Sequence, residues 1–231
     1  MLRLWDSFNG FEMTAREAGT DPELLRAANV AAAVGLMVAT LPVLLAAMLA
    51  VRLTSRGPVI YRQTRVGLDR RARDGQADCR RADDLGGQPF TIYKLRTMVV
   101  DAEQGSGAVW ATKNDPRVTT VGRFLRATRI DELPQLWNVL RGDMNLVGPR
   151  PERPQIVQRL KREVLGYSMR HRVRPGITGL AQVSQHYDES IDDVRRKVDY
   201  DIAYMRARTL RTDMQILART VPVVLRRLGA N

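Results

Sequence analysis

The stretch AANVAAAVGLMVATLPVLLAAMLAV, from Ala27 to Val51, contains no charged residue and decides which kind of fold the chain can adopt. An apolar helix of this length matches the hydrocarbon thickness of a bilayer. The stretch starts well inside the chain and follows no lysine-rich segment, which argues against a signal peptide. It therefore predicts a helix in contact with lipid, and a helix buried in a soluble core is the weaker alternative.

Pro42 lies near the centre of this stretch. Proline removes one backbone donor and clashes with the carbonyl four residues earlier, so a kink or a break is expected. Thr40 is close enough in sequence to satisfy a freed backbone group. Two architectures stay open on these residues: a kinked helix that crosses the bilayer, and a helix-break-helix that enters one leaflet and returns. Arginines follow the stretch and predict a cytoplasmic C-terminal body, namely Arg52, Arg56, Arg62 and Arg65.

The composition suits an enzyme at a membrane surface. The 231 residues carry a net charge of +12, which favours anionic lipid headgroups and diphosphate substrates as partners. Nucleic acid is the weaker partner, because aromatic content is 6% and no nucleic-acid-binding motif is present. The single cysteine, Cys79, excludes an intramolecular disulfide, and only His171 and His186 stand beside it as zinc ligands. Zinc chemistry is therefore not expected.

The chain divides into three segments. Residues 1–26 form a polar leader, residues 27–56 the membrane helix broken at Pro42, and residues 57–231 a membrane-surface catalytic domain. Residues 69–88 are dense in Arg, Asp and Gly and predict an exposed loop to which no role is assigned.

An adjacent carboxylate pair, Asp131 and Glu132, is the main candidate for catalysis. It lies in TVGRFLRATRIDELPQLWNVLRGDMNLVGPRP, from Thr120 to Pro151. Asp131 precedes an apolar-periodic segment in which Pro134 fits the first turn and Gly142 can cap the end. The pair is thus predicted at a helix N-terminus. Taken alone, such a pair is more often an N-cap followed by a dipole-favoured glutamate.

The surroundings of the pair favour phosphoryl transfer. The helix N-terminus and two arginines one turn upstream, Arg126 and Arg129, are expected to keep Asp131 ionised and to attract a phosphate. An ionised, positioned Asp131 can attack phosphorus and form an acyl phosphate, while Glu132 deprotonates or orients the second acceptor.

Further basic residues are candidates for phosphate binding. The strand predicted over 90–96 would bring Lys94 and Arg96 to one side, although two basic residues on a strand are often merely solvated. Arg150 stands between two prolines in a rigid turn, and Arg174 precedes a Pro-Gly turn. The helix predicted over 155–172 is amphipathic, so it can lie on lipid or face the core.

Together these segments resemble the small monotopic phosphoglycosyl transferases, bacterial sugar transferases that begin the assembly of exopolysaccharide, O-antigen or glycoprotein glycans. The resemblance covers residues 27–204. Its motifs are the membrane helix with Pro42, FTIYKLRTM (90–98), NDPRVTTVGRFLRATRIDELPQLWNVLRGDMNLVGPRPE (114–152) and RPGITGLAQV (174–183). It implies an α+β, predominantly helical fold with a re-entrant helix broken at Pro42, amphipathic interfacial helices and a small β element.

The resemblance also implies an activity: transfer of a sugar 1-phosphate from a UDP-sugar to polyprenyl phosphate, with release of UMP, at the cytoplasmic face of the bacterial inner membrane. It implies magnesium, held at Asp131. By motif match, Asp131 is the nucleophile and Glu132 its partner, and the phosphate-binding residues are Arg126 and Arg150, with Lys94 and Arg174 following. Arg96 stays a substrate-binding candidate from the strand pattern.

Some points stay open on the sequence. Leu41 stands before Pro42 where many relatives have serine, and Ser184, Gln185 and His186 replace a common Gly-Arg-Asn, so the sugar is not determined. Self-association is also undetermined. The rival hypotheses are a catalytically inactive membrane scaffold that binds acidic partners and a nucleic-acid-binding membrane protein; the intact carboxylate pair argues against the first.

Overall fold

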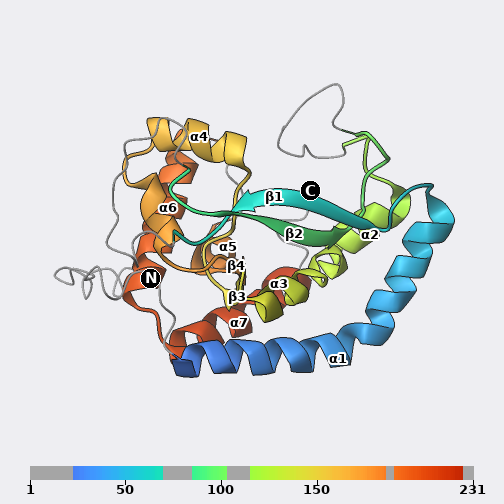
Figure 1. Cartoon of the computed structure of the whole chain (residues 1–231), viewed down its shortest axis with the longest axis horizontal. Helices are drawn as coiled ribbons and strands as arrows, with labels where there is room; N and C mark the ends of the chain where they lie inside the picture. Colours follow the sequence, from blue (N-terminus) through green and yellow to red (C-terminus); the bar gives the residue numbers. More distant parts are fainter. Residues whose placement is uncertain (1–22, 70–84, 103–114, 186–189, 226–231) are drawn as a thin grey trace.

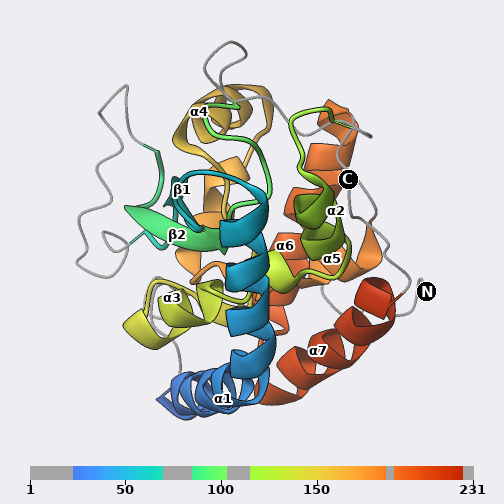
Figure 2. The same cartoon turned by 90° about the vertical axis from the view of Figure 1, so that its right-hand side faces the viewer.

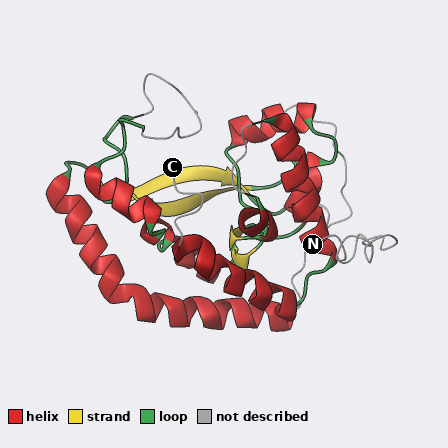
Figure 3. Cartoon of the chain, turned by 180° about the vertical axis from the view of Figure 1, so that it is seen from behind, coloured by secondary structure: helices red, strands yellow, loops and turns green. Residues whose placement is uncertain are grey.

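Helices make up most of the structure, a computed structural model that describes residues 23–69, 85–102, 115–185 and 190–225 (Figure 3). The helices are α1 (Glu23–Thr54), α2 (Thr120–Ala127), α3 (Gln135–Arg141), α4 (Pro154–Glu163), α5 (Leu180–Ser184), α6 (Ile191–Arg206) and α7 (Leu210–Leu225), with 3-10 turns η3 (Ile130–Glu132) and η4 (Tyr167–Arg172). The predicted α+β, predominantly helical fold is confirmed. The predicted loop over 69–88 lies largely outside the described residues.

The β structure consists of two small sheets in the described part of the chain. Strand β1 (Ile60–Val66) pairs antiparallel with β2 (Pro89–Leu95). Strand β3 (Asn145–Val147) pairs parallel with β4 (Gly176–Thr178). The strand predicted from sequence is therefore present, but it ends at Leu95. A parallel pair needs a crossover connection, which α4 and η4 supply here.

Helix α1 is continuous through Pro42 and bends (Figure 1). The expected helix-break-helix is thus realised as a bend, because proline deletes one hydrogen bond while its neighbours keep theirs. Thr40 Oγ1 donates to the Leu36 carbonyl at 2.7 Å, a back-bond that also favours bending. The helix starts by Glu23, so residues 23–26 of the predicted leader belong to it. By length and hydropathy, it is the described helix that can cross a membrane, and most of its apolar stretch is exposed.

Both ends of α1 contact the same body. Near its N-terminus, Asn29 Oδ1 accepts a hydrogen bond from the Leu146 amide at 2.8 Å. Arg26 donates from Nη1 to the Met144 carbonyl at 3.2 Å. Near its C-terminus, Val51 is buried in an apolar cluster with Leu95. The bend therefore lets one apolar helix touch the globular domain twice.

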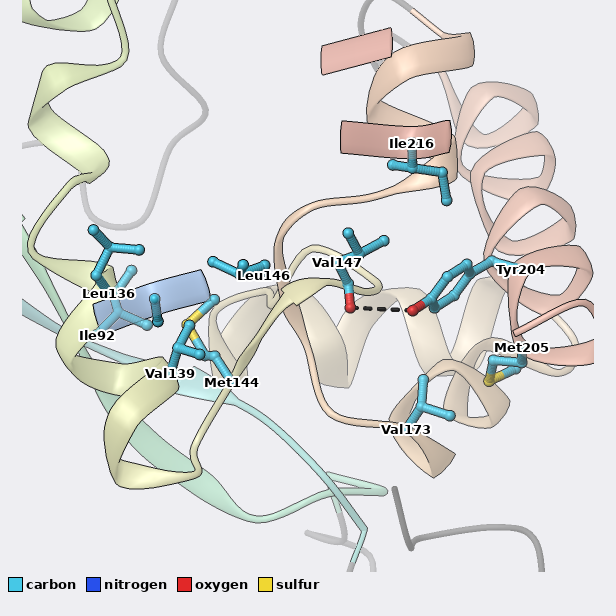
Figure 4. Packing of buried hydrophobic residues seen from close by; sticks show 11 residues of the cluster. Ile92, Leu136, Val139, Met144, Leu146, Val147, Val173, Tyr204, Met205 and Ile216 are labelled. Atoms are coloured by element: carbon cyan, nitrogen blue, oxygen red, sulfur yellow. Dashed lines mark hydrogen bonds between the residues drawn. The ribbon is translucent and has the colours of Figure 1, made fainter. Parts of the chain in front are cut away.

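The main core lies between α3, the β3–β4 pair and the C-terminal helices (Figure 4). The Tyr204 hydroxyl donates at 2.8 Å to Asp213, and it also lies 3.2 Å from the Val147 carbonyl. These bonds satisfy a phenol that is almost fully buried, as a core tyrosine requires. The core therefore fixes β3, and with it the loop that follows β3.

The single helix predicted over 155–172 is divided in the structure. Helix α4 ends at Glu163, and Gly166 adopts a left-handed conformation with φ 75° before η4 begins. Val157 and Leu160 of α4 are buried in a cluster with Tyr167, so this face packs against the core. Leu165, which follows α4, is fully exposed. The core-facing alternative is the one that the packing supports.

Candidate active site

Asp131 and Glu132 lie in η3, a short turn between α2 and α3. The prediction that Asp131 begins the following helix is wrong, because α3 starts only at Gln135 and Pro134 is its N-cap. Arg129, the N-cap of η3, has φ 58° and ψ 13°. A left-handed residue other than glycine is uncommon and costs free energy, and such residues cluster at functional sites. The chain thus turns sharply to present the carboxylate pair.

Glu132 is held by two cations from different elements. Lys94 Nζ, from β2, lies 2.8 Å from Oε1. Arg150 Nη2, from the loop after β3, donates to the same oxygen at 2.7 Å. Burial alone would raise the pKa of Glu132, but the charges of Arg150 and Lys94 hold it well below its usual range. Glu132 is therefore ionised and engaged.

Asp131 differs sharply from its neighbour. Its Oδ1 is buried and accepts no hydrogen bond within the described residues. Burial raises the pKa of Asp131 to about 6 and the charge of Glu132 adds to the rise, although Lys94 and Arg129 oppose it. Arg126 and Arg129 favour the ionised form of Asp131 as expected, but burial outweighs them, so the Asp131 pKa is raised and not lowered. An unpartnered buried carboxylate is available to a ligand or to phosphorus.

The pair opens onto a cavity of about 1520 Å³. The basic side chains in its wall near the pair are Lys94, Arg126, Arg129 and Arg150. Arg126 Nε donates to Thr97 Oγ1 at 2.9 Å, which fixes its direction. The structure thus brings Asp131, Glu132, Lys94, Arg126 and Arg150 to one wall, from β2, α2, η3 and the β3 loop. Cations around a desolvated carboxylate form a site for a phosphorylated ligand.

Arg96 and Arg174 have other contacts. Arg96 reaches the cavity wall, but its Nη2 donates to the Ser55 carbonyl at 2.8 Å and thereby joins β2 to the end of α1. Lys94 and Arg96 therefore have different partners, Glu132 and the Ser55 carbonyl, although both line the cavity. Arg174 Nε donates to the Gly142 carbonyl at 2.9 Å, at the C-terminal end of α3, and Arg174 does not line the cavity.

The same cavity has an apolar flank between α1 and α7, which lie on one side of the molecule (Figure 2). Its walls are Leu36, Ala39 and Val43 of α1 and Leu217, Val223 and Val224 of α7. Helix α7 is thus part of the site. One cavity therefore joins a cationic wall to an apolar one.

Several polar residues behind the site have no obvious sequence signal. Arg170 and Asp201 form an ion pair with an N–O distance of 2.8 Å and almost no exposure. Asp115 is also buried, and hydrogen bonds from Arg117 lower its pKa to about 2. Asn29 is different, because the sequence itself marks it as a polar amide in an otherwise apolar segment. Charged residues are common in amphipathic helices, so their burial depends on packing.

Asp131 is the residue that the sequence suggests as a magnesium ligand. The described residues contain no group of three or more His, Cys, Asp or Glu side chains placed to hold a metal ion. The unpartnered Asp131 Oδ1 nevertheless suits Mg²⁺, which is often held by one or two carboxylates together with substrate phosphates and water.

The sequence that builds this site matches a known family. The chain matches the family model described as "Bacterial sugar transferase" over residues 22–227. The chain belongs to the bacterial sugar transferase family. The family assignment covers the whole site, from α1 to α7.

Curated relatives in this family carry specific names. A UDP-glucose:undecaprenyl-phosphate glucose-1-phosphate transferase of Caulobacter vibrioides is 42% identical over 220 residues, which is 92% of this chain and 76% of that protein. A UDP-N-acetylgalactosamine-undecaprenyl-phosphate N-acetylgalactosaminephosphotransferase of Aeromonas hydrophila is 42% identical over 189 residues, covering 82% of this chain and 40% of that protein. The glucose-1-phosphate transferase of Escherichia coli is 39% identical over 206 residues, covering 88% and 40%. The chain thus spans about two fifths of the Aeromonas and Escherichia proteins.

Proposed function

We propose that this protein transfers a hexose 1-phosphate from a UDP-sugar to polyprenyl phosphate and releases UMP. The observation that carries the proposal is the asymmetry of the carboxylate pair: Asp131 Oδ1 is desolvated and unpartnered while Glu132 is bound by Lys94 and Arg150. The family and the names of its curated relatives support it. Because those relatives act on different sugars, the sugar is left open.

In the proposed reaction, Asp131 attacks the phosphorus atom that bears the sugar. A carboxylate oxygen forms a bond to phosphorus, the bond from that phosphorus to the bridging oxygen breaks, and UMP leaves with the electron pair. An oxygen of polyprenyl phosphate then attacks the same phosphorus and displaces the Asp131 carboxylate. Two easier displacements thus replace one difficult displacement. An ionised carboxylate with little solvation is suited to the first step.

Glu132 has an electrostatic role in this proposal. Its low pKa makes Glu132 a weak base. Its charge instead orients Lys94 and Arg150 and raises the pKa of Asp131. An entering diphosphate competes for the same two cations, and Arg126 lies on the same wall. Charges fixed before the substrate arrives stabilise the phosphoryl transition state without costly reorganisation.

Magnesium is the proposed cofactor. Asp131 would hold it, with substrate oxygens and water completing the coordination. Bound there, Mg²⁺ would supply neutralisation of the charge that develops on the diphosphate. This chain's own residues bind and orient the remaining phosphate charge.

The acceptor lipid is proposed to lie along the apolar flank between α1 and α7, with its phosphate at the cationic wall. Exposed Phe124, Trp137 and Val221 on α2, α3 and α7 offer further apolar contacts with the membrane surface. Since both ends of α1 contact one body, α1 is proposed to be re-entrant and to leave that body on the cytoplasmic face of the inner membrane.

The test measures UMP release from a panel of UDP-sugars with polyprenyl phosphate and Mg²⁺. The native chain is expected to use at least one donor, Asp131→Asn to lose at least a thousandfold, and EDTA to abolish turnover. Without acceptor, a native enzyme incubated with sugar-labelled donor should carry one label per chain.

Asp192→Asn is the matched control, because Asp192 is an exposed carboxylate paired with Arg195 on α6. It should retain native rates. Activity that survives in Asp131→Asn, or a native enzyme that releases no UMP from any donor, would contradict the proposal and favour the scaffold alternative.

A further inference from the structure

A buried ion pair lies behind the cationic wall, outside the cavity. Arg170 Nη2, in η4, is 2.8 Å from Asp201 Oδ2, in α6, and the two side chains are 2% and 3% exposed. Removing two charges from water costs several kcal/mol per ion. Apolar residues of similar volume often replace such a pair without loss of stability. The pair therefore calls for an explanation other than simple stabilisation.

The contacts of Arg170 lead directly to the site. Its Nη2 donates to the backbone carbonyl of Arg150 at 2.9 Å. Its Nη1 donates to the Tyr167 hydroxyl at 2.9 Å. The side chain of Arg150, from the same residue whose carbonyl is held, binds Glu132 at 2.7 Å. A continuous series of contacts thus runs from α6 through Arg170 and Arg150 to Glu132.

The segment around Arg150 is held at neighbouring points as well. Pro149 and Pro151 have fixed φ angles and restrict the backbone on either side of Arg150. The hydrogen bond to the Arg150 carbonyl therefore largely sets the remaining orientation of this residue. Arg65 Nη1 donates to the Pro151 carbonyl at 3.1 Å. Lys197 Nζ lies 2.9 Å from Glu152 Oε1. Arg170 differs from these because it contacts the residue that itself reaches the carboxylate pair.

We propose that Arg170 and Asp201 are positioning residues for the transfer reaction: they hold the Arg150 backbone so that its guanidinium reaches Glu132 and the substrate phosphate. The role rests on the proposed function. It requires the guanidinium of Arg170, because Nη1 donates to Tyr167 and Nη2 to Arg150, and the single nitrogen of a lysine cannot occupy both positions. Asp201 orients and neutralises that guanidinium.

The experiment is a double-mutant cycle on the full chain in membranes. Arg170→Lys and Arg150→Ala are made singly and together, and kcat and KM are measured for donor and acceptor. Arg170→Lys alone is expected to lower kcat about tenfold to a hundredfold, since small displacements of a positioning group have effects of that size. In the Arg150→Ala background the same substitution should change kcat less than twofold, because the Arg150 side chain through which Arg170 acts is absent.

Val194→Ala is the matched control for stability. It removes two methyl groups from a residue that is 1% exposed and lies on α6, the helix that carries Asp201. It should lower the Tm with kcat unchanged. If Arg170→Lys lowers kcat by equal factors in both backgrounds, or no more than Val194→Ala does, the positioning role is overturned. Asp201→Asn provides a second, milder variant if Arg170→Lys does not fold.

The same cycle is measured on the affinity for UDP, which needs no turnover. Coupling between Arg170→Lys and Arg150→Ala in UDP affinity is expected, and additive effects would contradict the proposal. This readout separates the two proposals. If the two substitutions have coupled effects on UDP affinity while the native chain releases no UMP, the proposed transfer is refuted and positioning by Arg170 is supported.

Discussion

Two neighbouring carboxyl groups acquire different properties from their contacts alone. Glu132 has Lys94 and Arg150 within hydrogen-bond distance, so its pKa is depressed. Asp131, one residue earlier, is equally buried but has an oxygen without a partner, so its pKa is raised to about 6. Separated pKa values in an adjacent pair are a common basis for dividing catalytic roles.

The first prediction concerns pH. In the proposed reaction Asp131 must be ionised to attack, and its pKa is raised to about 6. The rate of the first step should therefore fall about tenfold per pH unit below about 6 and be constant above about 7. The UMP burst without acceptor is the appropriate measurement, because a UDP-sugar diphosphate does not titrate in this range. A burst rate that does not change between pH 7 and about pH 4.5 would contradict the prediction.

The second prediction concerns the stability of Asp131→Asn. A carboxyl with a raised folded pKa contributes stability that is present below its unfolded value of 3.8 and lost as pH rises through about 6. At pH 7, Asp131→Asn should thus be more stable than the native chain, by at most on the order of 3 kcal/mol. Near pH 4 the difference should vanish. Thermal unfolding at both pH values tests this, with Asp192→Asn as the unaffected control.

At the scale of single residues, the sequence indicated which residues form the candidate site better than it indicated the contacts of those residues. Asp131, Glu132, Lys94, Arg126 and Arg150 are found on one cavity wall. The desolvation of Asp131 was not predicted, because burial depends on residues far away in the chain. Arg96 was predicted from the strand pattern and Arg174 from the motif, and only the folded chain shows their carbonyl partners. Their part in substrate binding stays a prediction.

At Gly122, α2 lies very close to the backbone of Thr97. A Cβ on Gly122 would lie 2.0 Å from the Thr97 carbonyl oxygen, which already accepts the Thr119 amide at 3.0 Å. Gly122→Ala should therefore cost about 1–3 kcal/mol or more and lower the Tm. Gly35→Ala in α1 is the contrast, because its Cβ would meet no atom within 4 Å. It should be neutral or stabilise by up to about 1 kcal/mol. Equal effects of the two substitutions on the Tm would refute the close packing of Gly122 against the Thr97 carbonyl.

The attachment of α1 to β3 gives a second prediction at this scale. Asn29→Ala leaves the buried amide of Leu146 without its acceptor, which should cost about 1–3 kcal/mol. Thr54→Ala removes an exposed bond within the same helix, to the Ala50 carbonyl, and should cost less than about 0.5 kcal/mol. Thermal unfolding in detergent compares the two. An unchanged Tm for Asn29→Ala would show that this contact contributes nothing.

The element types followed from periodicity, whereas several element ends did not. The segment that begins α3 carries proline and acidic residues typical of a first turn, yet Arg129 turns the chain into η3 first. Gly166 similarly ends one helix where the apolar pattern continues. In both places a left-handed residue sets the boundary. Such conformations are imposed by packing and leave little trace in a hydrophobic pattern.

For the whole molecule, the contacts of α1 predict its topology. Its two ends bind one body, so both should face the same compartment. Glu23→Cys and Thr54→Cys, each in a Cys79→Ser background, place single thiols at exposed ends. A membrane-impermeant maleimide should label both in inverted vesicles and neither in intact cells. Labelling of the two ends from opposite faces would instead establish a helix that crosses the bilayer.

The proposed re-entrant topology of α1 would also have a mechanical consequence for the membrane. A helix that enters and leaves through the same face adds cross-sectional area to one leaflet and none to the other. Such a wedge relieves packing stress where that leaflet is stretched, so the energy of insertion depends on bilayer curvature. The protein should accordingly bind small, highly curved vesicles more tightly than flat bilayers of the same lipids, and straightening α1 with Pro42→Ala should weaken that preference.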